Sequence, residues 1–290
     1  MKVSIIGSGV VGKTVGFGFE RLGYEVIFYD IDEVVVKELS REHKATNDLE
    51  SAVKNTDISF ICVPTPYVSG LGFDSSYIVS ATEGIAEALK SKDEYHLIVI
   101  KSTLLPTTTE RVVIPILRKY KKVGKEIGIC TNPEFLTEIA DTWTNDEDYK
   151  KDFFTEDRIV IGEYDKKSGD ILESLYNPLN KPIFRTDLKT AELIKYSSNC
   201  MLATKISYWN EIFLICEKLG VDSQKVADIV GLDPRIGRYG TVHGKAFGGK
   251  CLPKDLKAFI SFVEKYRNVK LLKAVDEINE EMKRKYGVRE

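Results

Sequence analysis

Residues 7–12 read Gly-Ser-Gly-Val-Val-Gly, which has the spacing G-x-G-x-x-G. The motif directly follows a short apolar run, residues 3–6, and opens a stretch with helical periodicity that continues to Leu22. The next apolar run ends at Asp30, eighteen residues after the last glycine of the motif. A glycine turn between a strand and a helix, followed by an acidic residue at the end of the second strand, predicts a βαβ unit that binds a dinucleotide.

Each glycine of the motif has a separate physical task. Gly7 permits the tight turn, Gly9 lets the backbone approach the pyrophosphate, and Gly12 lets the helix pack closely against the strand. The N–H groups at the start of the helix, which include those of Val10 and Val11, then face the phosphates.

The end of the second strand indicates which dinucleotide binds. Asp30 is placed to accept hydrogen bonds from the ribose hydroxyls. Ile31 and Asp32 offer no cation for a 2′-phosphate, so NAD is favoured over NADP. The alternative is a plain glycine turn with an incidental aspartate, which the full context disfavours.

Six short apolar runs in the first half have the composition of strands buried on both faces. They cover residues 3–6, 25–29, 57–63, 97–100, 127–130 and 158–161. Amphipathic stretches lie between them, for example at residues 12–22, 33–40, 76–89 and 108–119. This alternation predicts a parallel sheet with helices on both sides.

The pattern changes near residues 185–189. Residues 190–219 read as one long helix that stops at Gly220, with Asp222 or Ser223 as the cap of the next helix. A glycine-rich segment, 231–249, and a final charged helical stretch follow. We therefore predict an α/β fold: a Rossmann-type doubly wound parallel sheet in residues 1–186, then an all-helical domain with a long central helix in residues 187–290.

The composition limits the classes of partner. The chain has 42 Lys and Arg against 44 Asp and Glu, a net charge of −2, whereas nucleic-acid and anionic-membrane binders need a basic surplus or stripe. Five cysteines without a C-x-x-C pair, and only three histidines, argue against a metal site. No apolar run approaches the roughly 20 residues of a membrane helix. We expect a cytoplasmic protein that binds no nucleic acid, membrane or metal.

Two predicted strands end in distinctive segments. Residues 62–66 read Cys-Val-Pro-Thr-Pro, and residues 101–103 read Lys-Ser-Thr. Ligands of open α/β folds bind at the carboxyl ends of strands, which makes Val63, Thr65 and the hydroxyl of Thr103 candidate contacts. An ordinary proline turn and a polar strand end explain the same residues equally well.

Residues 132–138, Asn-Pro-Glu-Phe-Leu-Thr-Glu, follow the strand predicted at 127–130. Asn132 is expected to cap a helix and Pro133 to be its first residue. Glu134 and Glu138 would then share a helix face. A functional carboxylate pair and a carboxylate that merely stabilises the helix N-terminus are equally supported.

Cys251 lies in a polar, glycine-rich setting, just before Pro253 and between Lys250 and Lys254. A helix N-terminus and nearby lysines lower the pKa of a thiol and favour a nucleophile, and Asp255 lies four residues further on. The alternative is a buried structural cysteine.

The predicted long helix carries a second polar pair on an otherwise apolar face. Lys195 and Asn199 are one turn apart and share this face with apolar residues. Burying a lysine is costly, so an ammonium in this position needs a reason. Either the pair is functional, or the amine of Lys195 reaches the surface.

Together these segments resemble the UDP-glucose/GDP-mannose dehydrogenase family. The ordered strings are G-S-G-V-V-G, C-V-P-T-P, K-S-T, N-P-E-F-L-T-E, A-E-L-I-K-Y-S-S-N, D-P-R-I-G and F-G-G-K-C-L-P-K-D, and they run from residue 1 to about residue 260. The resemblance implies a UDP-glucose 6-dehydrogenase-like oxidoreductase of polysaccharide biosynthesis. Such an enzyme oxidises the C6 alcohol of a nucleotide sugar to the uronic acid in two steps, with two NAD.

The resemblance also implies roles for single residues. Cys251 would form a thiohemiacetal and then a thioester, while Lys195 and Asn199 would stabilise the developing oxyanion. Asp255 would work with Thr103 and an ordered water in proton transfer, and Glu138 would serve thioester hydrolysis. The remaining expected contacts are, to NAD, Val63, Thr65, Thr103 and Lys254, and, to the sugar nucleotide, Glu134, Phe135, Leu136, Lys195, Asn199, Arg235, Phe247 and Gly248.

The resemblance implies a homodimer through the helix at 190–219, with Arg235 reaching the neighbouring subunit's sugar. Only 35 residues follow Asp255, whereas family members continue into a second nucleotide-binding domain, so we expect a short form that lacks it. A separate chain could supply that domain, the substrate could be smaller or held differently, or the chain could be a fragment. Thr137, residues 242–245 and Lys250 also depart from the family pattern, which leaves the sugar open.

Two other activities stay open. One is a single hydride transfer of the β-hydroxyacid dehydrogenase type, which needs no cysteine nucleophile. The other is a non-catalytic or partner-dependent NAD-binding subunit, which would bind NAD without turning over any sugar nucleotide. The reactivity of Cys251 separates the alternatives, because a reactive thiolate serves chemistry rather than binding alone.

Overall fold

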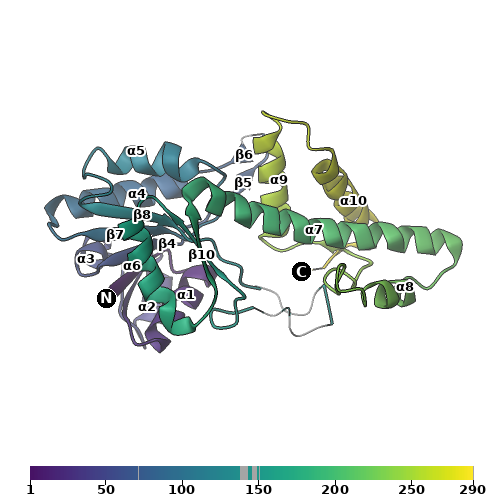
Figure 1. The fold of residues 1–290 in the computed structure, drawn as a ribbon, viewed down its shortest axis with the longest axis horizontal. Helices are drawn as coiled ribbons and strands as arrows, with labels where there is room; N and C mark the ends of the chain where they lie inside the picture. Colours follow the sequence, from purple (N-terminus) through teal and green to yellow (C-terminus); the bar gives the residue numbers. More distant parts are fainter. Residues whose placement is uncertain (71, 138–142, 146–148, 150, 290) are drawn as a thin grey trace. The chain divides into compact units, whose positions relative to one another are not determined.

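The chain forms two compact units in the computed structural model, which describes residues 1–289 except 71, 138–142, 146–148 and 150 (Figure 1). The N-terminal unit comprises Met1–Pro66, Asp74–Phe135 and Asp152–Lys195, and the helical unit comprises Tyr67–Phe73, Leu136–Lys151 and Tyr196–Glu290. The sequence predicts a boundary between residues 186 and 187, whereas the two units divide after Lys195, inside a long helix. Two short segments from the first half of the chain belong to the helical unit.

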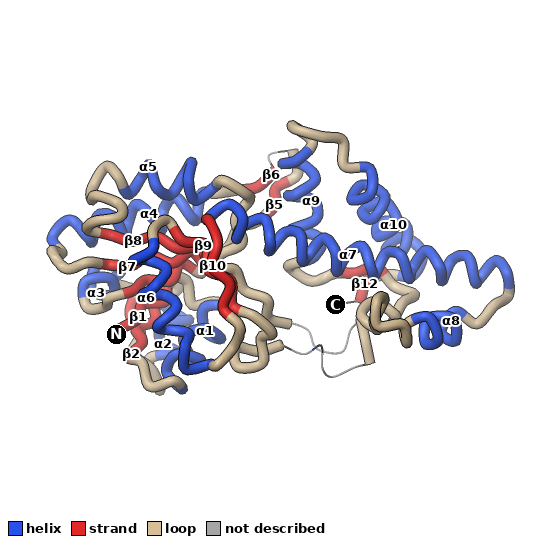
Figure 2. Tube along the Cα trace, in the orientation of Figure 1, coloured by secondary structure: helices blue, strands red, loops and turns tan. Residues whose placement is uncertain are grey.

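The N-terminal unit contains an eight-stranded sheet with the order β10-β9-β8-β7-β4-β1-β2-β3. Figure 2 shows the strands of this sheet in red between blue helices. Its strands are β1 (Lys2–Ile6), β2 (Glu25–Tyr29), β3 (Ala45–Thr46), β4 (Ile58–Ile61), β7 (His96–Ile100), β8 (Ile127–Thr131), β9 (Ile159–Glu163) and β10 (Ile183–Asp187). β1 pairs in parallel with β2 on one side and with β4 on the other, so the sheet grows from β1 in both directions. The predicted doubly wound fold is confirmed, and this reversal of strand order is where such folds bind their ligands.

Two strands differ from the prediction of a wholly parallel sheet: β9, and β10, which pairs with β9 in parallel. β9 pairs antiparallel with β8, with Cys130 opposite Glu163 and Thr131 opposite Gly162. A parallel neighbour requires a crossover that returns the chain to the opposite edge of the sheet, usually through a helix. The described residues between β8 and β9 are almost all loop and turn, with no such crossover among them. β9 therefore begins at the edge of the sheet where β8 ends, and it runs in the opposite direction.

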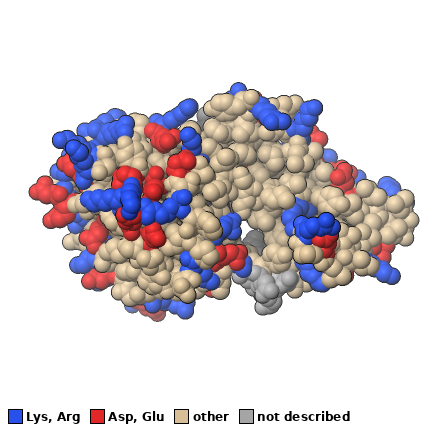
Figure 3. All heavy atoms as spheres, in the orientation of Figure 1, with Lys and Arg blue, Asp and Glu red and all other residues tan. Residues whose placement is uncertain are grey.

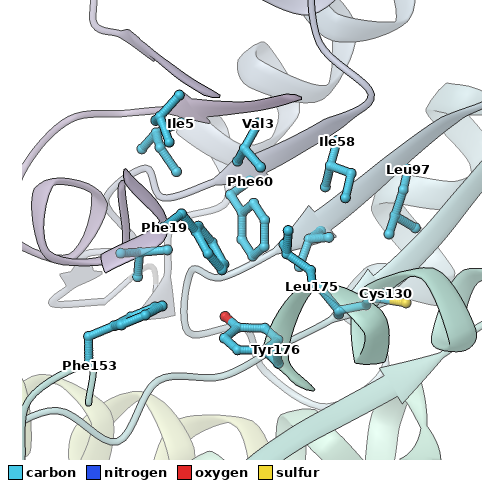
Figure 4. Packing of buried hydrophobic residues seen from close by; sticks show 14 of the residues in the cluster. Val3, Ile5, Phe19, Ile58, Phe60, Leu97, Cys130, Phe153, Leu175 and Tyr176 are labelled. Atoms are coloured by element: carbon cyan, nitrogen blue, oxygen red, sulfur yellow. The ribbon is translucent and has the colours of Figure 1, made fainter. Parts of the chain in front are cut away.

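Helices cover both faces of this sheet, with α4 and α5 on the face opposite α1 and α2 (Figure 1). They are α1 (Val10–Arg21), α2 (Glu33–Leu39), α3 (Leu49–Lys54), α4 (Ser76–Ala88), α5 (Ile114–Leu117) and α6 (Lys166–Tyr176), with short segments of tighter or wider helix at Leu89–Ser91, Thr109–Val113 and Asn177–Leu179. On one face the Phe19 ring of α1 lies 5.1 Å from Phe60 of β4 and 5.4 Å from Tyr176 of α6 (Figure 4). Every residue of β4 and β7 is buried, as their unbroken apolar runs predict.

The edge strand β10 is held to α6 by charge. Arg185 of β10 donates to Asp170 at 2.6 Å and to Glu173 at 2.8 Å, both on α6, and also pairs with Glu163 of β9. A network in which one arginine pairs with three carboxylates contributes more to the stability of the fold than an isolated surface ion pair does. Charged side chains of both signs are interspersed on the face that Figure 3 shows.

The helical unit packs around the part of the long helix α7 (Leu188–Leu219) that follows Lys195. Its other elements are α8 (Ser223–Val230), α9 (Leu252–Val263), α10 (Lys270–Tyr286) and two strand pairs, β5 (Tyr67–Val68) with β6 (Gly72–Phe73) and β11 (Ala246–Phe247) with β12 (Val288–Arg289). Ala203 and Ile206 of α7 pack with Leu256 of α9 and Val275 of α10 in a second core. The predicted helical part with a long central helix is confirmed. Among the described residues, no helix is long and apolar enough to cross a membrane.

Local sequence explains where α7 begins and ends and where α8 begins. Asp187 accepts hydrogen bonds from the N–H group of Thr190 at 3.0 Å and from its hydroxyl at 2.6 Å, at the start of α7. Gly220 follows α7 with φ +66°, the left-handed conformation that ends helices. Asp222 accepts two backbone N–H groups of α8, so this residue and not Ser223 is the cap.

Candidate functional site

The glycine motif occupies the turn between β1 and α1. A methyl group added at Gly12 would lie 2.1 Å from the Gly7 carbonyl oxygen and 3.0 Å from Ile5 Cγ2, so only glycine allows this packing. Gly7 has φ +95°, and a methyl there would lie 3.0 Å from the carbonyl of Cys62. A methyl at Gly9 would meet nothing within 4 Å, so this side of the turn is open. The tight turn at Gly7 and the close helix–strand packing at Gly12 are as the sequence predicts, and the open side of Gly9 is compatible with the predicted approach of a pyrophosphate.

Asp30 braces this turn through both oxygens of its carboxylate. Its Oδ2 accepts the N–H of Ser8 at 2.7 Å, and its Oδ1 accepts the N–H of Asp32 at 3.0 Å. Gly9 is the N-cap residue of α1 and has no side chain to cap the first N–H groups, and Val10 is 57% exposed. The start of α1 therefore offers N–H groups to an anion, which fits the pyrophosphate of NAD. The bond from Ser8 to Asp30 is not signalled by the motif.

The strand ends beside the motif are tied to each other. The hydroxyl of Ser102 donates to the carbonyl oxygen of Val63 at 2.7 Å, which links the segments that follow β4 and β7. Thr65 is buried and Thr103 is half-buried. These residues lie where β4 and β7 end, at the carboxyl edge of the sheet, as the sequence predicts.

The segment after β8 is not the helix that the sequence predicts. Residues 132–137 form a loop, and Glu138, predicted to share a helix face with Glu134, lies outside the described residues. Asn132 is buried, and its Oδ1 accepts the Lys101 ammonium at 3.0 Å and the Tyr176 hydroxyl at 2.6 Å. A side-chain oxygen already occupied in this way cannot cap a helix, so the expectation for Asn132 and Pro133 was wrong.

Glu134 pairs instead with a lysine of α7. Its Oε1 lies 3.0 Å from Lys195 Nζ, and both side chains are buried. Lys195 Nζ also lies 5.4 Å from the centre of the Phe135 ring. The alternative in which Lys195 reaches the surface is therefore wrong, and the ion pair offsets the cost of burying its charge.

Two further buried charges lie in the N-terminal unit at this segment. Burial lowers the pKa of Lys101, while the nearby Glu156 and Glu134 carboxylates oppose that change. Burial raises the pKa of Glu156, whose Oε1 accepts the N–H of Phe135 at 2.9 Å. Sequence reasoning identified Lys101 only as part of a strand end, and it missed Glu156 and Tyr176. No motif surrounds these two residues, so no sequence signal was available.

A separate polar cluster lies in the helical unit. Asn199 Nδ2 donates to Asp255 Oδ2 at 2.6 Å, and Lys254 pairs with the other oxygen of Asp255, which is only 1% exposed. Cys251 is half-buried and is the residue that precedes α9, with Pro253 in the first turn as predicted. The carbonyl of Cys251 accepts the N–H of Asp255 at 2.9 Å. The structure thus joins Asn199 and Lys254 to the carboxylate of Asp255, and it places Cys251 one helical turn before Asp255.

The remaining predicted substrate residues of this unit lie in different surroundings. Phe247 is buried, and Asn279 holds its backbone with both amide atoms, at 2.8 Å and 3.1 Å. Gly248 follows in the same segment, where its N–H donates to the Arg289 carbonyl at 3.2 Å. Arg235 has an 87% exposed side chain that pairs with Asp233. Leu136 is half-buried.

The described residues hold no group of three or more His, Cys, Asp or Glu side chains that could bind a metal ion. What they hold is a doubly wound sheet, a G-x-G-x-x-G turn at its switch point, and an acidic residue at the end of the second strand. These features define an NAD-binding dehydrogenase domain.

Comparison with known proteins identifies the family. The models of the UDP-glucose/GDP-mannose dehydrogenase family match the chain, the NAD-binding domain over residues 38–180 and the central domain over residues 189–281. The chain is 38% identical over 283 residues to the GDP-mannose 6-dehydrogenase of Pseudomonas syringae pv. syringae, and 36% identical over 307 residues to a UDP-glucose 6-dehydrogenase of Bacillus subtilis. These alignments cover 89% and 97% of the chain.

The fold comparison agrees. A UDP-glucose dehydrogenase structure from the hyperthermophilic archaeon Pyrobaculum islandicum matches with a TM-score of 0.90 and 35% identity, over 98% of this chain and 68% of that one. The chain therefore belongs to the UDP-glucose/GDP-mannose dehydrogenase family, and its cofactor is NAD. It spans 63% of the length of the Pseudomonas and Bacillus relatives.

Proposed function

We propose that the chain oxidises the C6 alcohol of a nucleotide sugar, UDP-glucose or a close analogue, to the uronic acid. When bound, NAD accepts one hydride in each of the two oxidations. The observation that carries the proposal is the position of Cys251 at the start of α9, one helical turn before Asp255, whose buried carboxylate holds Asn199 and Lys254. A single-step dehydrogenase needs no thiol in such a position.

Cys251 would form the covalent intermediates. After the first oxidation the thiolate adds to the aldehyde carbon to give a thiohemiacetal, and loss of the second hydride gives a thioester. Water then cleaves the thioester, which releases the acid and restores the thiol. The start of α9 supports this role, because the positive end of a helix favours a thiolate.

Lys195 and Asn199 would stabilise the oxyanion of these intermediates. They lie one turn apart on α7, and each is already held by a carboxylate, Lys195 by Glu134 at 3.0 Å and Asn199 by Asp255 at 2.6 Å. Donors fixed before the reaction stabilise new charge without reorganisation at the moment of transfer. We assign proton transfer from the alcohol to Asp255 with Thr103 and an ordered water, and thioester hydrolysis to Glu138.

We also propose that the chain forms a homodimer through α7. Met201, Tyr208 and Ile215 are 60%, 52% and 47% exposed and follow one another at intervals of seven residues on this helix. Apolar residues at that spacing form one stripe, which a second copy of the helix would cover. Size-exclusion chromatography with light scattering tests this, and a monomer at micromolar concentration contradicts it.

The cysteine mechanism is tested by C251S, with C216S as the matched control because Cys216 is a buried cysteine of α7 in the same unit. The measurement is acid formed from UDP-glucose and NAD. We expect C251S to form no acid and C216S to match the wild-type chain. Acid formation by C251S at the wild-type rate would overturn the mechanism. If the wild-type chain binds NAD but oxidises no sugar nucleotide, it is a non-catalytic or partner-dependent subunit.

A further inference from the structure

We propose that Lys101 and Glu156 are positioning residues that hold Asn132–Phe135, here named the Glu134 segment, so that the Glu134 carboxylate stays on Lys195. The inference rests on the proposed function, because it gives these two buried charges a task in the same reaction. Neither residue is expected to touch the substrate. Their effect passes through Glu134 to the ammonium that would stabilise the oxyanion.

Lys101 holds the first end of the Glu134 segment. Its ammonium donates to Asn132 Oδ1 at 3.0 Å, and the same oxygen accepts the Tyr176 hydroxyl at 2.6 Å. The amide nitrogen of Asn132 donates to the Val160 carbonyl at 2.8 Å. The side chain of Asn132 is thus fixed by the residue that follows β7, by α6 and by β9 together, which leaves the start of the segment one orientation.

Glu156 holds the other end. Its carboxylate accepts the N–H of Phe135 at 2.9 Å, and it is buried, with 6% of its surface exposed. Arg158, two residues after Glu156, also contacts this end, because its guanidinium lies 4.2 Å from the centre of the Phe135 ring. Glu134 lies between the two held ends, and its own carboxylate reaches Lys195. Both ends must stay in place for that 3.0 Å contact to persist.

The charge of Lys101 needs a reason beyond packing. Its ammonium donates to the neutral amide of Asn132, and the residue is only 3% exposed. Burying an ammonium is costly unless charges of opposite sign lie close by, and a methionine would fill similar space without that cost. Glu134 and Glu156 supply the opposite charge. The arrangement is therefore two carboxylates and two ammonium groups, Lys101 and Lys195, around one short segment.

The N-terminal unit contains a lysine that serves as a structural control. Lys92 is also buried, at 8% exposure, but its ammonium donates to the carbonyl oxygens of Val53 and Thr56, far from the carboxyl ends of the strands. Replacing either lysine by methionine removes one buried charge and its hydrogen bonds. Only K101M removes a bond to the Glu134 segment.

The test compares K101M, K92M and the wild-type chain by hydrogen–deuterium exchange and by steady-state kinetics. We expect the amide of Phe135 to exchange at least tenfold faster in K101M, and kcat with UDP-glucose to fall at least tenfold, as loss of one hydrogen bond to a charged group implies. The Kd for NAD should change less than twofold. K92M should lose stability, but the exchange of the Phe135 amide and kcat should stay at their wild-type values.

Glu156 gives a second test that does not depend on Lys101. E156Q keeps the oxygen that accepts the Phe135 N–H and should retain most of kcat, whereas E156L should behave like K101M. Unchanged exchange at Phe135 in both K101M and E156L would overturn the inference, as would faster exchange with an unchanged kcat. If the wild-type chain oxidises no sugar nucleotide, the proposed function fails, and the exchange measurement alone still decides whether Lys101 holds the segment.

Discussion

Two glycine substitutions in the β1–α1 turn separate folding from cofactor binding. In G12A the new methyl would lie 2.1 Å from the Gly7 carbonyl oxygen, well inside a normal contact of about 3.5 Å, so the turn must shift by roughly 1 Å. Overpacking of this kind costs about 1–3 kcal/mol of unfolding free energy. In G9A the methyl meets nothing within 4 Å, and we expect a change below about 1 kcal/mol.

Both variants should bind NAD more weakly, but only G12A should also lose stability. The open side of Gly9 is where the pyrophosphate must approach the backbone, so a methyl there takes the space of the ligand itself. We expect G9A to fold normally and to lose at least tenfold in NAD affinity, about 1.4 kcal/mol. G12A should lose both NAD affinity and stability.

The assay is isothermal titration calorimetry with NAD, paired with urea unfolding of the same samples. G9A with wild-type affinity and wild-type stability would refute the placement of the pyrophosphate at this turn. A G9A chain that unfolds as easily as G12A would refute the reading of Gly9 as an open position. The two variants differ by three positions in one turn, so each controls for the other.

Two buried ionisable groups predict opposite pH dependences of stability. Burial and the Lys92 ammonium lower the pKa of His96 to about 3, so between pH 6.5 and 3 the unfolded chain binds a proton that the folded chain does not. As the pH falls through this range, the free energy of unfolding measured in urea should drop by up to about 5 kcal/mol more in the wild-type chain than in H96N. The same pH dependence of the unfolding free energy in both chains would contradict this. Burial raises the pKa of Glu192 to about 7, so between pH 4.5 and 7 the folded chain holds a proton that the unfolded chain has lost. The free energy of unfolding should therefore fall by up to about 3 kcal/mol as the pH rises through this range in the wild-type chain, and not in E192Q. An equal change with pH in both chains would refute the raised pKa of Glu192.

The features that sequence predicts well are the ones that depend on neighbouring residues. The G-x-G-x-x-G turn and the long helix that stops at Gly220 are each set within a few residues, and the structure confirms them. Of the two caps that the sequence allowed for the next helix, the structure has Asp222. The strand runs were identified for the same reason, because unbroken apolar composition reports burial on both faces. The two-residue strand β3 and the partly exposed edge strand β10 carry too weak an apolar signal to be predicted.

The features that sequence misses depend on residues far apart in the chain. Asn132 resembles a helix cap in sequence, but its side chain is taken by Lys101, 31 residues earlier, and by Tyr176, 44 residues later. The direction of β9 depends on which edge the chain returns to, which composition does not encode. Glu156 became a candidate only through its bond to Phe135. The sequence indicated Glu134 and Lys195 as separate candidates. It could not predict that they pair, because they lie 61 residues apart and meet only in the folded chain.

The central claim is a two-step oxidation on a cysteine, and the ratio of NADH to acid tests it most directly. The wild-type chain is incubated with NAD and, separately, UDP-glucose and GDP-mannose, and both products are counted at completion. We predict two NADH for every molecule of uronic acid with one of these sugars. One NADH per sugar, with an aldehyde or ketone as product and no acid, would contradict the claim and indicate a single hydride transfer.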